Sequence, residues 1–192
     1  ELIDNDFAIE FSGDNYIDTS ATPAQLNLPA TTVSGGDFSI SLWYKYETFT
    51  HGSPVIQSTT NYNWNDGFAI REETVFAQNK LRFWVGAQPT YVRSGALNAS
   101  QWYHISCVFK GGATHTLEIY VDGVLAQTSS YTTSRDIHNS TSIYLGHDPT
   151  DGYTYYVTGD MDEVAIWSRA LEATDVQTIY NATNNNPGKC AN

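Results

Sequence analysis

The chain has 192 residues, a length that suits one domain with a single hydrophobic core. Lysine and arginine total 9 against 21 aspartates and glutamates, and the net charge of −12 disfavours nucleic acid as a partner. Charged residues make up 16% of the chain and hydrophobic residues 41%, a balance that predicts a packed interior rather than disorder. No apolar run approaches the roughly 18 residues that span a bilayer, so we expect no membrane insertion.

Alternation of apolar and polar residues dominates the chain and predicts short β-strands. The pattern is clear in 37–46, where every second residue from Phe38 to Tyr44 is apolar. The dipeptide Asp122-Gly123 favours a tight hairpin turn between two of the strands. The predicted strands cover 7–11, 16–17, 37–46, 54–58, 67–71, 80–85, 102–109, 116–121, 124–127, 142–145 and 160–167.

One stretch, 173–180, has apolar residues at helical spacing and predicts a short helix. Many short strands without alternating helices favour an all-β fold, with antiparallel sheets packed as a sandwich. We expect a single domain over 1–183 and interpret 184–192 as a polar tail or a linker within a larger protein. The two cysteines, Cys107 and Cys190, can form a disulfide, or Cys107 can be a buried apolar residue.

Five segments in a fixed order resemble the laminin-G-like branch of the concanavalin A-like lectin/glucanase superfamily. They are 7–17, 38–43, 102–105, 119–123 and 159–167 with Arg169-Ala170-Leu171 after it. The resemblance implies a two-sheet jelly roll. Lectins, adhesion modules, hydrolases and lyases share this fold, so function has to be inferred from sites.

The carboxylates do not form a pattern typical of catalysis. Retaining glycosidases need two carboxylates about 5 to 5.5 Å apart, and the chain has no Glu-x-Asp-x-x-Glu motif. Glu72 and Glu73 are adjacent and point to opposite faces of a strand, which we interpret as a solvated strand end. His104 is interpreted as a structural residue within a strand. We therefore predict that the chain is not an enzyme.

A structural calcium ion is predicted around Asp162. Strand alternation places Asp162 on the same face as Val164 and Ile166, and a carboxylate buried there needs a partner. The resemblance implies a ligand set of Asp162, carbonyl groups near Ser12 and at Gly36 or Asp37, with Asp14 as a further side-chain ligand. The alternative is that Asp162 caps a turn through backbone N–H groups.

A second acidic loop, 147–153, contains Asp148 and Asp151 before a glycine. Its composition suits calcium, but ordinary turn chemistry explains it equally well.

The candidate ligand site consists of two loops, 61–66 and 153–156. A sugar offers apolar faces and hydroxyl groups, so aromatic rings flanked by amides and carboxylates suit it. Arg71 and Arg93 can form bidentate bonds with an acidic sugar. The alternative is that Trp64 covers a sheet edge. The predicted ligand-binding residues are Tyr62, Asn63, Trp64, Asn65, Arg71, Asp148, Asp151, Tyr153 and Tyr155.

The sequence thus predicts a calcium-stabilised, non-catalytic recognition module of a secreted or cell-surface protein. Its expected partner is a carbohydrate or a glycoprotein. One alternative is a structural or adhesive spacer that binds no sugar. Another is a divergent polysaccharide hydrolase or lyase.

Overall fold

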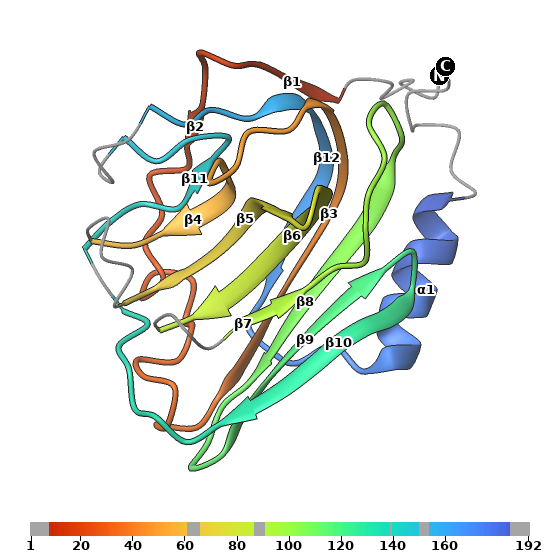
Figure 1. The fold of residues 1–192 in the computed structure, drawn as a ribbon. Helices are drawn as coiled ribbons and strands as arrows, with labels where there is room; N and C mark the ends of the chain where they lie inside the picture. Colours follow the sequence, from red (N-terminus) through yellow and green to blue (C-terminus); the bar gives the residue numbers. More distant parts are fainter. Residues whose placement is uncertain (1–7, 61–65, 87–90, 139, 150–153, 185–192) are drawn as a thin grey trace, which may run out of the picture.

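The computed structural model describes residues 8–60, 66–86, 91–138, 140–149 and 154–184. These residues fold into two antiparallel six-stranded sheets and one short helix, α1 (Ala173–Asn184), as Figure 1 shows. Sheet A consists, in pairing order, of β1 (Ile9–Ser12), β12 (Thr158–Trp167), β3 (Asp37–Thr48), β8 (Tyr103–Lys110), β9 (His115–Val121) and β10 (Val124–Tyr131). Sheet B consists of β2 (Ile17–Asp18), β11 (Tyr144–Leu145), β4 (Pro54–Ser58), β5 (Phe68–Val75), β6 (Gln78–Val85) and β7 (Tyr91–Arg93). The predicted all-β sandwich is confirmed.

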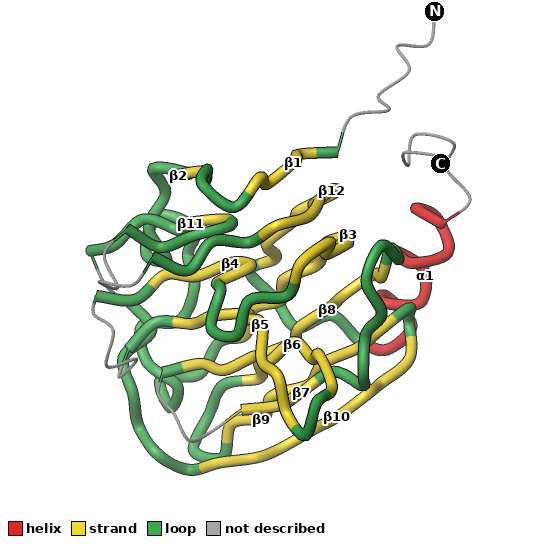
Figure 2. Tube along the Cα trace, turned by 45° about the horizontal axis from the view of Figure 1, so that its top comes forward, coloured by secondary structure: helices red, strands yellow, loops and turns green. Residues whose placement is uncertain are grey.

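The two sheets stack face to face and enclose the core between them (Figures 1 and 2). The alternation predicted for β3 is confirmed, because Phe38, Ile40 and Leu42 are 0% exposed on its inner face. Phe38 of sheet A packs against Phe68 of sheet B, with 5.3 Å between ring centroids. Burial of these inner-face side chains holds the sheets together.

Two hairpins turn through residues with positive φ, as tight β-turns of this kind require. Asp122 and Gly123 join β9 to β10 with φ values of 51° and 79°, which confirms the predicted turn. Phe76 and Ala77 join β5 to β6 with φ values of 49° and 59°. Neither residue type favours positive φ, so the second hairpin was not recognisable from its turn.

Other differences concern one strand that was missed and the end of the helix. β7 was not predicted, and α1 continues to Asn184, beyond the predicted end at 180. Cys107 is fully buried in β8 between the sheets, and burial raises the pKa of its thiol. Cys190 lies outside the described residues. The described residues hold no helix with the length and hydropathy of a membrane span.

Candidate functional site

The two outer faces of the sandwich differ in what covers them. α1 lies beside sheet A in Figures 1 and 2, where Leu171 and Val176 pack against Val108 and Tyr120 and all four side chains are buried. The described residues place no helix over the outer face of sheet B. Strand side chains and loops therefore form that face and would contact any ligand bound there.

A buried polar network lies on the outer face of sheet B, where β4, β5 and the segment after β11 meet. Arg71 of β5 donates a hydrogen bond to the side-chain oxygen of Gln57 in β4. The Gln57 amide donates to Asp148, with 2.6 Å between Nε2 and Oδ2. A second Arg71 nitrogen donates to the carbonyl oxygen of Gly52 at 3.0 Å. Arg71, Gln57 and Asp148 are each 0% exposed, so this network fixes the loops that it joins.

An aromatic cluster lies next to this network and consists of Tyr16, Tyr144, His147, Tyr155 and Tyr156. The His147 ring stacks on the Tyr156 ring with 3.9 Å between centroids. The Tyr16 ring packs edge-on against the His147 ring with 5.6 Å between centroids. His147 also donates from Nδ1 to the carbonyl oxygen of Tyr155 at 2.9 Å. Tyr16 and Tyr155 remain 43% and 37% exposed. The cluster thus presents aromatic surface to solvent beside fixed polar groups, a combination typical of ligand sites.

A charged cluster lies further along the same face, on β5, β6 and β7. Arg82 donates from Nη1 to Glu73 at 3.2 Å, and Arg93 donates to the same carboxylate through Nε and, at 3.1 Å, through Nη2. Burial raises the pKa of Glu73, but the Arg93 hydrogen bond and the positive charge of Arg82 outweigh it and hold the pKa below its ordinary value. Glu73 is therefore ionised at neutral pH.

Glu72, the neighbour of Glu73, faces the interior between the sheets. The Tyr44 hydroxyl donates to its Oε1 at 2.5 Å and the Thr50 N–H to its Oε2 at 2.8 Å. Burial raises the pKa of Glu72 to about 8, although both hydrogen bonds lower it. The opposite facing of the two glutamates agrees with the prediction, but the solvated strand end is wrong, since they are only 1% and 6% exposed.

The residues predicted to bind calcium do not converge. Asp162 pairs with Trp43 of β3. Trp43 and Asp37 are six residues apart on this strand, so Asp162 and Asp37 are about 20 Å apart. Ser12 pairs with Thr158, four residues from Asp162 and therefore about 13 Å away. The ligand set that the resemblance implied is not assembled in this structure.

Each of these residues has a local role instead. Ser12 donates from Oγ to Asp14 at 2.6 Å in the turn after β1, and Asp37, directly after Gly36, accepts the Gly111 N–H at 3.0 Å. Asp162 accepts the N–H of the next residue, Glu163, at 2.8 Å, which is the backbone-capping alternative. Within the described ranges no group of three or more histidine, cysteine, aspartate or glutamate side chains is placed to hold a metal ion.

The predicted facing of Asp162 is also wrong, because a β-bulge interrupts β12. Glu163 has a φ of 51°, and the register shifts between Asp162 and Ala165. Asp162 pairs with Trp43 on the outer side, whereas Ile166 pairs with the fully buried Ile40. The extra residue reverses the alternation on which the prediction depended.

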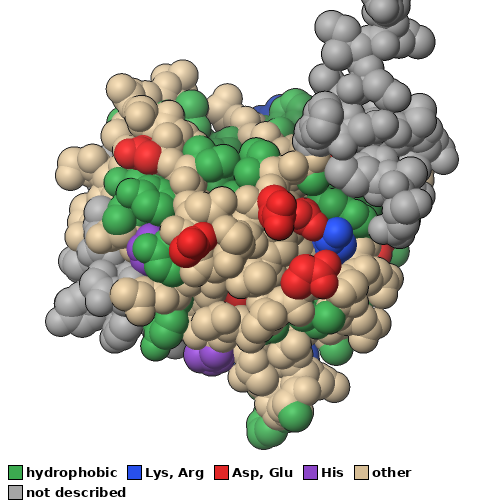
Figure 3. Space-filling model, turned by 90° about the horizontal axis from the view of Figure 1, so that it is seen from above, with side chains coloured by type: hydrophobic (Ala, Val, Ile, Leu, Met, Phe, Trp, Pro, Cys, Tyr) green, Lys and Arg blue, Asp and Glu red, His purple; other side chains and the backbone are tan. Residues whose placement is uncertain are grey.

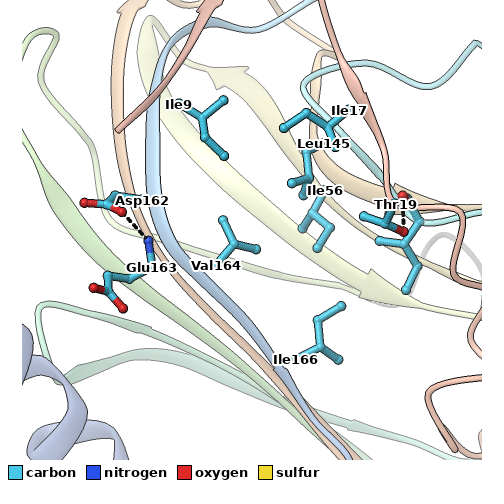
Figure 4. Close-up of a pocket in the computed structure, with 10 residues that line it drawn as sticks. Ile9, Ile17, Thr19, Ile56, Leu145, Asp162, Glu163, Val164 and Ile166 are labelled. Atoms are coloured by element: carbon cyan, nitrogen blue, oxygen red, sulfur yellow. Dashed lines mark hydrogen bonds between the residues drawn. The ribbon is translucent and has the colours of Figure 1, made fainter. Parts of the chain in front are cut away.

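An apolar pocket of about 420 Å³ lies between the sheets at their β1–β12 and β2–β11 edges. Figure 4 shows aliphatic side chains around the space, with the carboxylates of Asp162 and Glu163 at its margin. Figure 3 looks onto this side of the molecule and shows hydrophobic and acidic side chains on it. The lining offers few polar groups to a sugar. The residues that line it are Ile9, Ile17, Thr19, Ile56, Ile143, Leu145, Asp162, Glu163, Val164 and Ile166.

Part of the predicted ligand site is brought together on sheet B. Arg71 and Asp148 meet through Gln57, and Tyr155 packs against Gly52, whose carbonyl accepts from Arg71. The sequence prediction missed Gln57, Tyr16 and His147 as members of the site. Only the pairing of β11 with β4 and β2 brings them together, and no local motif marks them. The predicted residues Tyr62, Asn63, Trp64, Asn65, Asp151 and Tyr153 lie outside the described residues.

Solved structures share this fold. Domain 4 of AbnA, a GH43 extracellular arabinanase from Geobacillus stearothermophilus in complex with arabinotriose, superposes with a TM-score of 0.63 at 20% identity, covering 90% of this chain and 76% of that one. The CBM40 of the Ruminococcus gnavus IT-sialidase, bound to α2,3 sialyllactose, gives 0.68 at 14% identity, covering 90% and 96%. The SAP-like pentraxin of Limulus polyphemus gives 0.69 at 17% identity, covering 94% and 84%.

Sequence comparison agrees with the fold. None of the curated proteins compared with the chain matches it. The model of a laminin G family, described as the concanavalin A-like lectin/glucanases superfamily, matches residues 12–177. This match covers most of the chain and contains the buried polar network, the aromatic cluster and the charged cluster. The chain therefore belongs to the concanavalin A-like lectin/glucanases superfamily.

Proposed function

We propose that the chain is a non-catalytic module that binds glycan on the outer face of sheet B, within an extracellular or cell-surface protein. The observation that carries the proposal is the aromatic cluster, in which Tyr16 and Tyr155 expose ring surface next to the Gln57–Asp148 hydrogen bond. The rings suit the apolar faces of a sugar. The buried network holds the surrounding loops in place, which lowers the entropy cost of binding.

Two structures of the same fold support the choice of ligand. The arabinanase domain is in complex with arabinotriose, and the CBM40 is bound to sialyllactose. The present chain leaves one sandwich face without a helix among its described residues, and strand side chains and loops form that face. A sugar is therefore the ligand class that fits this face best.

The state of the two adjacent glutamates supports a non-catalytic role. A general acid for glycoside hydrolysis needs a raised pKa and contact with the substrate. Glu73 faces outward, but its arginine partners lower its pKa. Glu72 has a raised pKa, but it faces the interior. Neither glutamate combines the two requirements.

Replacing Tyr155 with alanine is expected to weaken glycan binding about fivefold or more, because loss of an aromatic stacking surface costs ~1–3 kcal/mol. Affinity electrophoresis in gels that contain one polysaccharide each, followed by titration of the best ligand, measures the change. Tyr16→Ala tests the second exposed ring. Leu125→Ala is the matched control, since Leu125 is an exposed apolar side chain on β10 of the other sheet.

Three outcomes separate the candidate functions. Saturable binding that falls in Tyr155→Ala and not in Leu125→Ala supports a glycan-binding module. The absence of binding across a broad panel leaves the structural or adhesive spacer. Release of reducing ends or unsaturated products from any polysaccharide would show a hydrolase or lyase and overturn the non-catalytic role.

Calcium stays part of the proposal as a structural ion, supported by the acidic composition alone. A bound ion makes the melting temperature lower in EDTA than in calcium chloride, because the ion binds the folded chain and not the unfolded one. Equal melting temperatures would remove calcium from the proposal. A difference that persists in Asp162→Ala would show that the ion is held elsewhere.

A further inference from the structure

Positive charge gathers on the outer face of three neighbouring strands of sheet B. The whole chain has 9 lysines and arginines against 21 acidic residues. Four of the nine, Arg71, Lys80, Arg82 and Arg93, point outward from β5, β6 and β7. Within these described strands the outer face carries a single carboxylate, Glu73. The local charge of this face is therefore opposite to that of the chain as a whole.

Three of these cations form one cross-strand row. Arg82 pairs with Arg71 on one side and with Arg93 on the other. Like charges directly opposite each other on neighbouring strands are destabilising. Arg71 is neutralised within the buried network, but Arg82 and Arg93 share Glu73. One carboxylate between two guanidinium groups leaves one positive charge in excess.

The excess charge faces solvent. The side chains of Arg93 and Arg82 are 29% and 12% exposed, whereas that of Glu73 is 8% exposed. The Tyr91 ring lies 4.3 Å from the Arg93 guanidinium carbon and 5.6 Å from that of Arg82, which holds both groups in place. A guanidinium fixed in this way binds a carboxylate or sulfate with little further loss of side-chain entropy.

The net charge of the chain does not oppose such a ligand at close range. At physiological ionic strength the Debye length is about 8 Å, so acidic side chains elsewhere on the surface are largely screened. The cationic row and the aromatic cluster also share one face, and the four strand spacings from β11 to β7, which carries Arg93, span about 19 Å. An oligosaccharide of a few sugars can contact both.

We propose that the outer face of β5, β6 and β7 binds the anionic groups of an acidic glycan, with Arg93 as the main contact and Arg82 and Lys80 beside it. The inference rests on the proposed function and specifies the ligand class of that site. A guanidinium recognises carboxylates and sulfate esters through the same chemistry. The test ligands therefore have to distinguish a carboxylate from a sulfate.

Matched pairs of polysaccharides provide the test. Polygalacturonate against its methyl ester tests a carboxylate, and dextran sulfate against dextran tests a sulfate, all in 0.15 M sodium chloride without divalent ions. We expect the natural chain to bind at least one anionic member ten times more tightly than its neutral partner. Arg93→Gln should lose that preference about tenfold, and Lys80→Gln should weaken it in the same direction.

Lys110→Gln is the matched control, since it removes one positive charge from β8 of sheet A, where Lys110 pairs with Glu118. Thermal melting checks that each variant is folded, and Lys80→Gln serves as the test if Arg93→Gln is not. Equal binding of the neutral partners with continued dependence on Tyr155 would overturn the acidic specificity and leave the proposed function intact. Equal losses in Lys110→Gln and Arg93→Gln would also overturn it. No binding to any glycan overturns both proposals.

Discussion

Replacing Arg71 with methionine is expected to destabilise the fold by about 3–5 kcal/mol, because it leaves the buried Asp148 carboxylate without the cation that reaches it through Gln57. In a chain of this size such a loss lowers the melting temperature by roughly 10 °C. The same change removes the bond to the Gly52 carbonyl. Because Tyr155 packs against Gly52, glycan binding should weaken together with stability.

A double-mutant cycle separates this coupling from a simple loss of packing. Asp148→Asn removes the negative charge with little change in shape. If the two charges stabilise each other, the double variant Arg71→Met/Asp148→Asn should lose less stability than the sum of the single variants. Urea unfolding monitored by tryptophan fluorescence gives the four free energies. Additive losses, or a melting temperature of Arg71→Met within 2 °C of that of the natural chain, would contradict the coupled network.

The positions of most strands along the chain were predictable because the residues of each such strand favour extended structure locally. The inner face of β3 and the turn at Asp122-Gly123 illustrate this, since in both cases local residues dictate local geometry. The β5–β6 hairpin was missed because Phe76 and Ala77 adopt positive φ without the usual residue types. β7 is only three residues long, and its place comes from pairing with β6 rather than from a pattern of its own.

The candidate site was less predictable than the fold, because its parts meet through tertiary pairing. Arg71 and Asp148 were singled out for their chemistry, but the residue that joins them, Gln57, has no motif. The predicted calcium ligands around Asp162 do not converge for a related reason. A single bulge residue, Glu163, reversed the alternation, and nothing in its residue type signals a positive φ.

Glu72 gives the stability of the fold a pH dependence, which Glu72→Gln should remove. The folded chain holds the proton of Glu72 up to about pH 8, whereas the unfolded chain releases it near the ordinary pKa of 4.5. The stabilisation is therefore complete below pH 4.5 and is lost as pH rises to about 8. The expected slope within this window is about 1.4 kcal/mol per pH unit. Glutamine imitates the protonated form, since its carbonyl can accept the Thr50 N–H and its amide can donate to Tyr44.

The free energy of unfolding at pH 5, 6, 7 and 8 measures this effect in both chains, from urea titrations with a common slope. Other groups titrate equally in both, so the difference between the natural chain and Glu72→Gln isolates one carboxyl group. We expect near-equal stabilities at pH 5 and an advantage of a few kcal/mol for Glu72→Gln at pH 8. Glu73→Gln should be less stable than the natural chain. The lowered pKa of Glu73 stabilises the folded chain at pH values above the ordinary glutamate pKa, and the variant loses this contribution. Parallel pH curves for the natural chain and Glu72→Gln would show that Glu72 is ionised in the folded state and that its hydrogen bonds from Tyr44 and Thr50 outweigh its burial.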